Sequence, residues 1–195
     1  MTDELVPIIP SDILIFGVPP ERYPNMKLRP RIHEMLQAAA DSLAPGWAIV
    51  IYSAYRPFRD QITYWNRRLI WLAREHPSWT EEELITECRR WVADPRQGSG
   101  HQAGAAVDVT LRQPSGKELD MGTAIGEFSE RTPTASPGLT AEQEANRQKL
   151  LNVMHRAGFI NYIDEWWHFS HGDRLWAEMT GAPESDVIYQ PFFTD

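Results

Sequence analysis

Hydrophobic and polar positions recur with helical spacing in two well-delimited parts of this chain. From Pro30 to Gly46 the hydrophobic residues fall on one face, with a proline near the start and a glycine after the end. A second such segment runs from Thr140 to Gly158, where Thr140 and Gln143 have the spacing of a capping box. We therefore predict two amphipathic helices that each bury one face.

The segment from residue 60 to residue 91 has the same helical character but is interrupted once. The sequence EHPSW separates its two halves. Thr80 and Glu83 again have the spacing of a capping box, which predicts the start of the second half. We expect two helices here, with their tryptophan and leucine side chains in the core.

Two shorter segments have features of strands instead. Residues 47–52 (WAIVIY) form a β-branched run, typical of a buried strand that delivers the sequence SAYRPFRDQ at its C-terminal end. In residues 106–111 (AVDVTL), Val107 and Val109 alternate with Asp108. Asp108 is therefore predicted to point away from the apolar face of its strand.

The remaining segments show no sustained period. Residues 1–29 are punctuated by prolines, and residues 112–139 are rich in Gly, Pro, Ser and Thr. An unstructured connection as long as the second is uncommon in a compact domain unless it serves a site or is disordered. Helices and short strands without regular alternation predict an α+β fold. The length favours a single domain over residues 1–195.

Composition and charge narrow the classes of function. The net charge is -8 and no cluster of Lys and Arg is present, which argues against nucleic-acid binding. Cys88 is the only cysteine, which excludes an intrachain disulfide and a metal site built from thiolates. No stretch is apolar and long enough to span a bilayer, and the first residues lack the pattern of a signal peptide. We predict a cytoplasmic protein whose partner is a small substrate rather than nucleic acid or a membrane.

Two histidines and two carboxylates are candidates for a metal site: His101, Asp108, Glu165 and His168. These are ligand types that a divalent ion such as zinc prefers. Taken singly, each has a plainer interpretation, because a loop histidine usually lies at the surface and a strand aspartate can simply face water. Their spacing does not match the helical signature of two histidines four residues apart. A site would have to be assembled from a loop, a strand and a distant segment.

The sequence EWWH, from Glu165 to His168, presents a geometric difficulty. Residues three apart in a straight strand face opposite sides, so a bend or a short helical turn is needed to bring both to one side. The adjacent aromatic residues could exclude water from a site, although aromatic residues are more often core: Trp166, Trp167 and Phe169. His171 is a rival ligand, in a stretch whose glycine and aspartate indicate a turn.

Four motifs, in order, resemble those of the zinc D-alanyl-D-alanine peptidases. Residues 99–111 (SGHQAGAAVDVTL) resemble the S-x-H-x-x-G-x-A-x-D motif, and residues 165–168 (EWWH) resemble the E-x-W-H motif. Two further segments resemble the D-Ala-D-Ala dipeptidases of the VanX type: SAYRP at 53–57 and DMGTAIGEFSERT at 120–132. The resemblance covers about residues 43–168. It is specific, because four motifs must coincide in order.

The resemblance implies a reaction and a role for particular residues. It implies that His101, Asp108 and His168 bind one zinc ion per chain, which leaves a fourth coordination position for water. Glu165 would be the general base and acid, and Arg56 would stabilise the oxyanion. The implied activity is a zinc dipeptidase that hydrolyses D-Ala-D-Ala, or a similar dipeptide, by attack of a metal-bound water.

The resemblance also implies a fold and contacts with the substrate. The fold would be a small antiparallel sheet flanked by helices, as in D,D-peptidases and hedgehog proteins, with the zinc site at the sheet edge. Ser99 would help to hold the substrate. One position departs from the pattern, because Gly126 stands where these dipeptidases have an aspartate that binds the substrate's ammonium group. Glu127, the next residue, is a candidate replacement.

Two other functions stay open. A carboxypeptidase or endopeptidase acting on peptidoglycan stem peptides would use the same zinc chemistry on a longer substrate. A non-catalytic zinc-binding interaction domain could dispense with the base and the arginine, but this chain has both Glu165 and Arg56. A dipeptidase of this type would serve either antibiotic resistance or the recycling of dipeptides from the cell wall.

Overall fold

The computed structural model describes residues 4–194, and its centre is a five-stranded sheet. The strands lie in the order β2 (Leu14–Phe16), β4 (Ala48–Ser53), β5 (Ala106–Arg112), β7 (His168–Ser170) and β6 (Ile160–Asn161). The outer strand β2 is parallel to β4, and the other neighbours are antiparallel. The predicted α+β class is confirmed, with a sheet that is antiparallel except for this outer pair.

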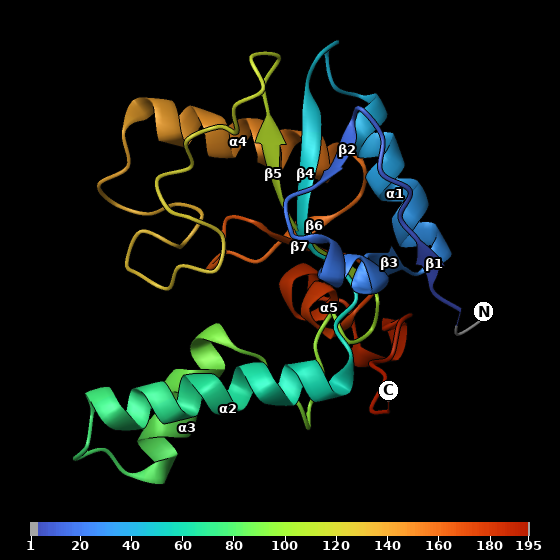
Figure 1. Cartoon of the computed structure of the whole chain (residues 1–195). Helices are drawn as coiled ribbons and strands as arrows, with labels where there is room; N and C mark the ends of the chain where they lie inside the picture. Colours follow the sequence, from blue (N-terminus) through green and yellow to red (C-terminus); the bar gives the residue numbers. More distant parts are fainter. Residues whose placement is uncertain (1–3, 195) are drawn as a thin grey trace.

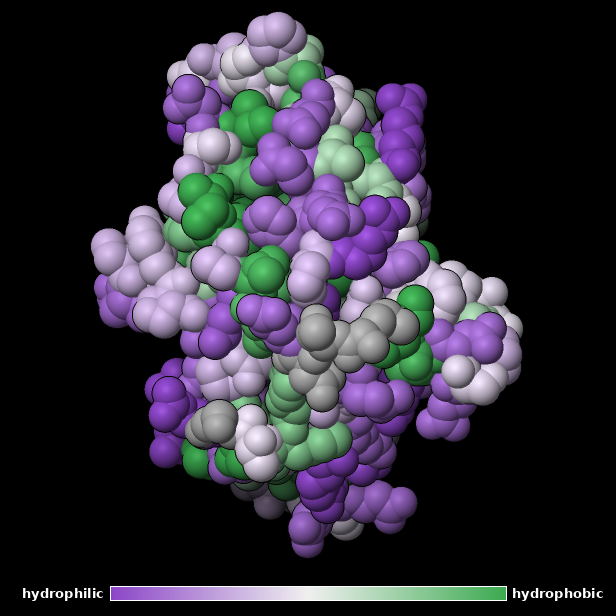
Figure 2. Space-filling model, turned by 90° about the vertical axis from the view of Figure 1, so that its right-hand side faces the viewer, coloured by the Kyte–Doolittle hydropathy of each residue, from purple (hydrophilic) through white to green (hydrophobic). Residues whose placement is uncertain are grey.

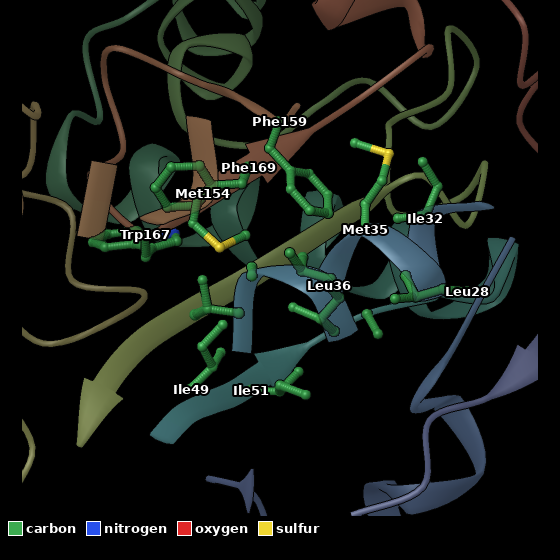
Figure 3. Packing of buried hydrophobic residues seen from close by; sticks show 14 of the residues in the cluster. Leu28, Ile32, Met35, Leu36, Ile49, Ile51, Met154, Phe159, Trp167 and Phe169 are labelled. Carbon is green, nitrogen blue, oxygen red and sulfur yellow. The ribbon is translucent and has the colours of Figure 1, made fainter. Parts of the chain in front are cut away.

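Helices α1 (Pro30–Asp41) and α4 (Ala141–Arg156) contact each other and pack on one face of the sheet (Figure 1). Both were predicted, and the capping box of α4 is present. Figure 3 shows the buried side chains where these helices meet the sheet, among them Ile32, Met35, Leu36, Ile49, Ile51, Met154 and Phe169. Burying a side chain of this size contributes about 1.5–3 kcal/mol. This core therefore fixes which face of each strand points inward.

The two helices predicted between residues 60 and 91 are confirmed as α2 (Phe58–Glu75) and α3 (Glu81–Trp91). They form a hairpin that extends away from the sheet (Figure 1). The prediction that their large side chains join the core is only partly correct. Trp65, Leu72 and Cys88 pack in a small cluster of their own, and Trp71 is 47% exposed.

Secondary structure also occurs in the N-terminal segment, where the sequence pattern predicted none. Strand β1 (Val6–Pro7) pairs with β3 (Lys27–Leu28), and a 3-10 helix covers Pro20–Asn25. Strand β2 joins the main sheet with only three residues. A run as short as this has no detectable period, so its pairing with β4 cannot be read from the sequence.

The long segment after β5 contains no helix or extended strand over residues 113–139. It is held by Arg147 of α4, which is 2% exposed. The guanidinium group donates to four backbone carbonyl oxygens, those of Met121 (2.8 Å), Arg131 (2.8 Å), Pro133 (2.6 Å) and Thr134 (3.4 Å). These contacts satisfy carbonyl groups that regular secondary structure would otherwise pair.

After β7 the chain forms α5 (Arg174–Thr180), a 3-10 helix (Glu184–Asp186) and an extended C-terminal segment. Arg29 joins this segment to the loop before β5. Its side chain donates to the carbonyl oxygens of Ala103 (2.8 Å) and Gln190 (3.2 Å). The C-terminal segment is therefore fixed beside the loop that carries His101.

The face shown in Figure 2 is largely hydrophilic, with small hydrophobic groups between the polar ones, which agrees with the net charge of -8. Within residues 4–194, the structure contains no helix with the length and apolar character needed to cross a membrane.

Candidate active site

Asp108 and His168 lie directly opposite each other on the neighbouring strands β5 and β7. Their sequence neighbours Val107, Val109 and Phe169 belong to the core, so strand alternation turns both polar side chains to the other face. His168 Nδ1 lies 3.1 Å from Asp108 Oδ1. The prediction that Asp108 leaves the apolar face is confirmed.

His101 reaches the same place from the loop that precedes β5. This loop is fixed to the end of β4, because the amide of Arg56 donates to the carbonyl oxygen of His101 (3.1 Å). His101 Nδ1 lies 2.7 Å from the carbonyl oxygen of Ala54, and its Nε2 lies 3.2 Å from Asp108. Donation from Nδ1 to a carbonyl selects the tautomer whose Nε2 lone pair is free to bind a metal.

The three side chains have the geometry of a metal site. One ligand atom from each of His101, Asp108 and His168 lies within 4.8 Å of the other two, and all three residues are buried. Zinc bonds of about 2.0–2.2 Å in a tetrahedral arrangement hold ligand atoms roughly 3.3 Å apart. The two imidazole nitrogens lie 3.2 and 3.1 Å from the Asp108 carboxylate. The donor set therefore fits zinc, with a fourth position left for another ligand.

The expected location of this site at the sheet edge is not confirmed. Asp108 and His168 belong to β5 and β7, which lie inside the five-stranded sheet rather than at its outer strands. The group sits where these two strands pair, beneath the loop that carries His101. Cross-strand pairing, and not the exposure of an edge strand, brings the ligands together.

Burial and mutual charge shift the pKa values of this group. Burial lowers the pKa of His101. Burial opposes ionisation of Asp108, but the neighbouring imidazoles outweigh it and hold the pKa of this carboxyl well below its usual range. For His168, burial is outweighed by the hydrogen bond and charge of Asp108, so its pKa is raised. The carboxylate is thus kept ionised between the two imidazoles.

Glu165 lies in a turn that immediately precedes β7. Its amide donates to the carbonyl oxygen of Tyr162 (3.1 Å), and the amide of His168 donates to the carbonyl oxygen of Glu165 (3.2 Å). This bend resolves the difficulty of the EWWH spacing. Burial, helped by the charge of Asp108, raises the pKa of Glu165 to about 7. Its aromatic neighbours Trp166, Trp167 and Phe169 are core residues, and Trp167 also lines the same cavity as Glu165.

Arg56 follows the end of β4 and points its side chain toward the same group. Its Nη1 donates to Gln61 Oε1 (3.0 Å), and its Nη2 lies 4.0 Å from Asp108 Oδ2. Its Nε is buried and has no hydrogen-bond partner among residues 4–194. The guanidinium group stacks on the ring of Tyr64 at 4.7 Å. A buried donor without a partner is available to an oxygen atom of a bound molecule.

These side chains share one cavity of about 360 Å³, within the range of sites for small molecules. The cavity is lined by all three candidate ligands, Glu165, Arg56 and Ser99. Its walls come from the end of the helical hairpin, from the loop around Gly126, and from α5 with the C-terminal segment. The sequence did not single out the hairpin or the C-terminal segment as parts of a site, because their contribution depends on tertiary contacts alone.

The remaining candidate residues have different positions. Ser99 lines the cavity, and its hydroxyl accepts a hydrogen bond from the amide of Gln102 (3.2 Å). Glu127 is not among the lining residues, because its carboxylate accepts hydrogen bonds from Ala124 and Ser129 of its own loop. The structure therefore does not bring Glu127 to the other candidates. The rival ligand His171 is also separate, since its Nδ1 contacts the carbonyl oxygen of Gly158 at 2.9 Å.

Asp173 is a lining residue that the sequence interpretation missed. Its Oδ1 accepts hydrogen bonds from the amide of Trp176 and the hydroxyl of Ser170, both at 2.9 Å, which caps α5. Its Oδ2 is buried without a hydrogen-bond partner in the described part of the chain. Burial raises the pKa of this carboxyl. An aspartate directly before a helical run is a capping signal, and it could have revealed α5.

Gly100→Ala is expected to disturb the loop that carries His101. A Cβ at this position would lie 2.2 Å from Asp173 Oδ2 and 2.9 Å from the Cβ of Ala106, so one of the segments must move. We expect about 1–3 kcal/mol of lost stability and weaker zinc binding, measured by denaturant unfolding and by zinc titration.

Gly116→Ala is the matched control for this substitution. A Cβ at Gly116 meets no atom within 4 Å, although its φ of +84° makes any side chain strained. We expect a loss of about 1–2 kcal/mol from the strain, with unchanged zinc affinity. Wild-type zinc affinity in Gly100→Ala would contradict the steric argument.

Residues 27–186 match a family model described as D-ala-D-ala dipeptidase. The D-alanyl-D-alanine dipeptidase of Escherichia coli (strain K12) is 35% identical over 124 residues, which are 64% of this chain and 55% of that relative. The D-alanyl-D-alanine dipeptidase of Synechocystis sp. (strain ATCC 27184 / PCC 6803 / Kazusa) is 33% identical over 177 residues, covering 77% of this chain and 71% of that relative. This chain thus spans little more than half of the Escherichia coli protein.

The fold is also found among solved structures. The LdcB LD-carboxypeptidase, whose structure is described as revealing the molecular basis of peptidoglycan recognition, is similar with a TM-score of 0.50 and 19% identity. The similarity covers 83% of this chain and 68% of that one. At this identity the likeness supports the fold and nothing more.

Proposed function

Since this chain belongs to the D-Ala-D-Ala dipeptidase family of peptidases, we propose that it is a zinc-dependent dipeptidase that hydrolyses D-Ala-D-Ala or a closely similar dipeptide. One observation carries the proposal. A single cavity brings together three residues with zinc-type ligand atoms (His101, Asp108 and His168), a further carboxylate (Glu165) and an arginine (Arg56). The names of both relatives agree with this activity.

In this proposal zinc is held by His101, Asp108 and His168. When bound, the ion polarises the carbonyl group of the scissile peptide and lowers the pKa of a water molecule. The spacing of 3.1–3.2 Å between the imidazole nitrogens and the Asp108 carboxylate supports this assignment. So does the contact between His101 Nδ1 and the carbonyl oxygen of Ala54, which holds the ring with Nε2 turned inward.

Proton transfer is assigned to Glu165. Its carboxylate would accept the proton of the attacking water and deliver it to the nitrogen of the leaving amine. The position of Glu165 in the cavity, one short turn before His168, supports this role. Trp166 and Trp167, which follow Glu165 and are buried in the core, would keep that turn rigid.

Arg56 is assigned to the oxygen of the scissile carbonyl. As the reaction proceeds, negative charge develops on this oxygen, and a guanidinium donor stabilises it. The Nε of Arg56 supports this role, because it is buried and has no partner among the described residues. Ser99, beside His101 in the cavity wall, would help to hold the substrate.

The direct test is hydrolysis of D-Ala-D-Ala by the purified, zinc-loaded protein. We expect two molecules of D-alanine to be released per dipeptide, measured with a coupled D-amino acid oxidase assay. A chelator should abolish the reaction, and added zinc should restore it. Zinc-loaded protein that hydrolyses none of a panel of D,D- and L,D-dipeptides would refute the proposal.

A carboxypeptidase that acts on longer stem peptides is the second candidate. It is favoured by the open space at Gly126, which lines the cavity and where an added Cβ meets no atom within 4 Å. Comparing kcat/KM for the dipeptide and for a pentapeptide that ends in D-Ala-D-Ala decides between the two. The cytoplasmic location stays a prediction from the sequence.

A further inference from the structure

The arginines in the cavity wall differ in how their charge is compensated. Arg89, at the end of α3, donates to the carboxylate of Asp94 at 3.1 Å, and Arg96 binds the same carboxylate at 2.7 Å. Arg174, in α5, pairs with Glu178 at 3.2 Å and donates to Gln97 at 3.3 Å. Each of these cations already has a protein carboxylate.

Arg90 lines the cavity without such a partner. Within residues 4–194, no carboxylate forms an ion pair with its guanidinium group, which instead stacks on the ring of Trp91 at 4.8 Å. Trp91 is itself fixed, because its Nε1 donates to Glu87 (2.9 Å) and its ring lies 5.5 Å from that of Phe128. Arg90 is exposed, and its guanidinium group lies against this aromatic surface at the wall of the cavity.

Arg90 lines the same cavity as the candidate zinc ligands. Tyr162, whose ring lies 6.3 Å from that of His168, lines this cavity as well. Gly126 and Phe128 line the same cavity. Asp94, which lines this wall, is shared between two arginines that hold the pKa of its carboxyl well below its usual range. Asp94 is therefore already engaged by Arg89 and Arg96 and does not neutralise Arg90.

A guanidinium group without a counter-ion, stacked on an aromatic ring, matches the planar geometry of a carboxylate. We propose that Arg90 binds a carboxylate of the peptide substrate and thereby selects which peptides this enzyme accepts. The inference rests on the proposed peptidase function. Two carboxylates of a peptide have this chemistry, namely the C-terminal carboxylate of the dipeptide and an acidic side chain in an amino-terminal extension.

The test measures binding, so that it does not depend on turnover. Zinc-loaded protein carrying Glu165→Gln is titrated calorimetrically with four peptides, with and without Arg90→Gln. The peptides are D-Ala-D-Ala, its C-terminal amide, D-Glu-D-Ala-D-Ala and D-Gln-D-Ala-D-Ala. Loss of charge-assisted hydrogen bonds predicts affinity weakened about tenfold or more for peptides whose carboxylate contacts Arg90.

The pattern across the four peptides identifies the carboxylate. If Arg90 binds the C-terminal carboxylate, Arg90→Gln weakens D-Ala-D-Ala but not its amide. If Arg90 binds an acidic extension, only the D-Glu tripeptide is affected. Arg90→Lys, which keeps the charge but not the paired donors, should recover part of the affinity. In the active enzyme, Arg90→Gln should raise KM and leave kcat within about twofold, since Arg90 does not face the reacting atoms.

Several results would overturn the proposal. The proposal is wrong if Arg90→Gln changes the affinity for each of the four peptides by less than about twofold. It is also wrong if Arg90→Gln weakens binding of charged and uncharged peptides equally, since that would indicate a structural role for Arg90. Failure of all four peptides to bind would also count against it. Arg31→Gln, at an exposed pair with Glu34 on α1, is the control and should change nothing. If the proposed peptidase function is wrong, the protein with an intact Glu165 will hydrolyse none of the peptides. That result differs from one in which hydrolysis occurs but Arg90→Gln leaves binding unchanged.

Discussion

Replacing Glu165 by glutamine is expected to lower kcat by about 10²–10⁴-fold while the protein keeps its zinc. The amide has nearly the shape of the carboxylate but cannot accept a proton from water. Zinc should be retained because Glu165 is not one of the three residues whose ligand atoms converge. The measurements are D-alanine release under saturating D-Ala-D-Ala and the zinc content of the purified protein.

Glu127→Gln is the matched control for this substitution. Glu127 is exposed, lies outside the cavity and is hydrogen-bonded within its own loop, so activity close to that of the unmodified protein is expected. Unchanged kcat in Glu165→Gln would remove Glu165 from the reaction. Loss of zinc together with activity would show instead that its carboxylate helps to hold the metal.

Asp108→Asn is expected to weaken zinc binding by more than about 100-fold and to abolish activity at limiting zinc. Changing a residue that merely orients a ligand typically costs about 10–100-fold in metal affinity, and Asp108 is a candidate ligand itself. It is also the residue that both imidazoles contact, at 3.2 and 3.1 Å. The substitution therefore removes the only negative charge among the three converging side chains.

Zinc affinity is measured by competition with a chromophoric chelator, and the coupled effect by thermal unfolding. Zinc at about 100 times its Kd should stabilise the wild-type protein by about 2.7 kcal/mol, because only the folded state offers the assembled site. Asp108→Asn should gain almost nothing at the same concentration. Asp41→Asn, at the exposed end of α1, should behave like the wild type. Equal stabilisation of Asp108→Asn by zinc would exclude Asp108 as a ligand.

The strand that carries Asp108 could be predicted from its alternation, because Val107 and Val109 share a buried face and Asp108 does not. What the alternation cannot give is the register. His168 lies opposite Asp108 because β5 and β7 pair, and that pairing joins segments sixty positions apart. Ligand type and the resemblance to a known family had grouped these two residues, but neither gives the register that places them opposite each other.

Predictions based on adjacency along the chain were less successful than those based on periodicity. Glu127 was a candidate because it follows Gly126. Its carboxylate instead accepts hydrogen bonds from the amide of Ala124 and the hydroxyl of Ser129. Hydrogen bonds inside a loop are not visible in its composition. Arg89 and Arg90 show the converse, since nothing in the sequence of α3 indicates that these two arginines line a cavity formed mostly by distant segments.

The helical hairpin of α2 and α3 has a core of its own, formed around Trp65, Leu72 and Cys88 and separate from the main core. It meets the cavity only near its base, through Tyr64 on α2 and residues 89–93 at the end of α3. The zinc ligands do not depend on the packing inside this unit, but Arg56 does depend on its base, because Gln61 and Tyr64 of α2 contact the guanidinium group. A hairpin from a homologous enzyme that keeps these two contacts should therefore alter the cavity wall at residues 89–93 and leave the hydrolytic residues in place.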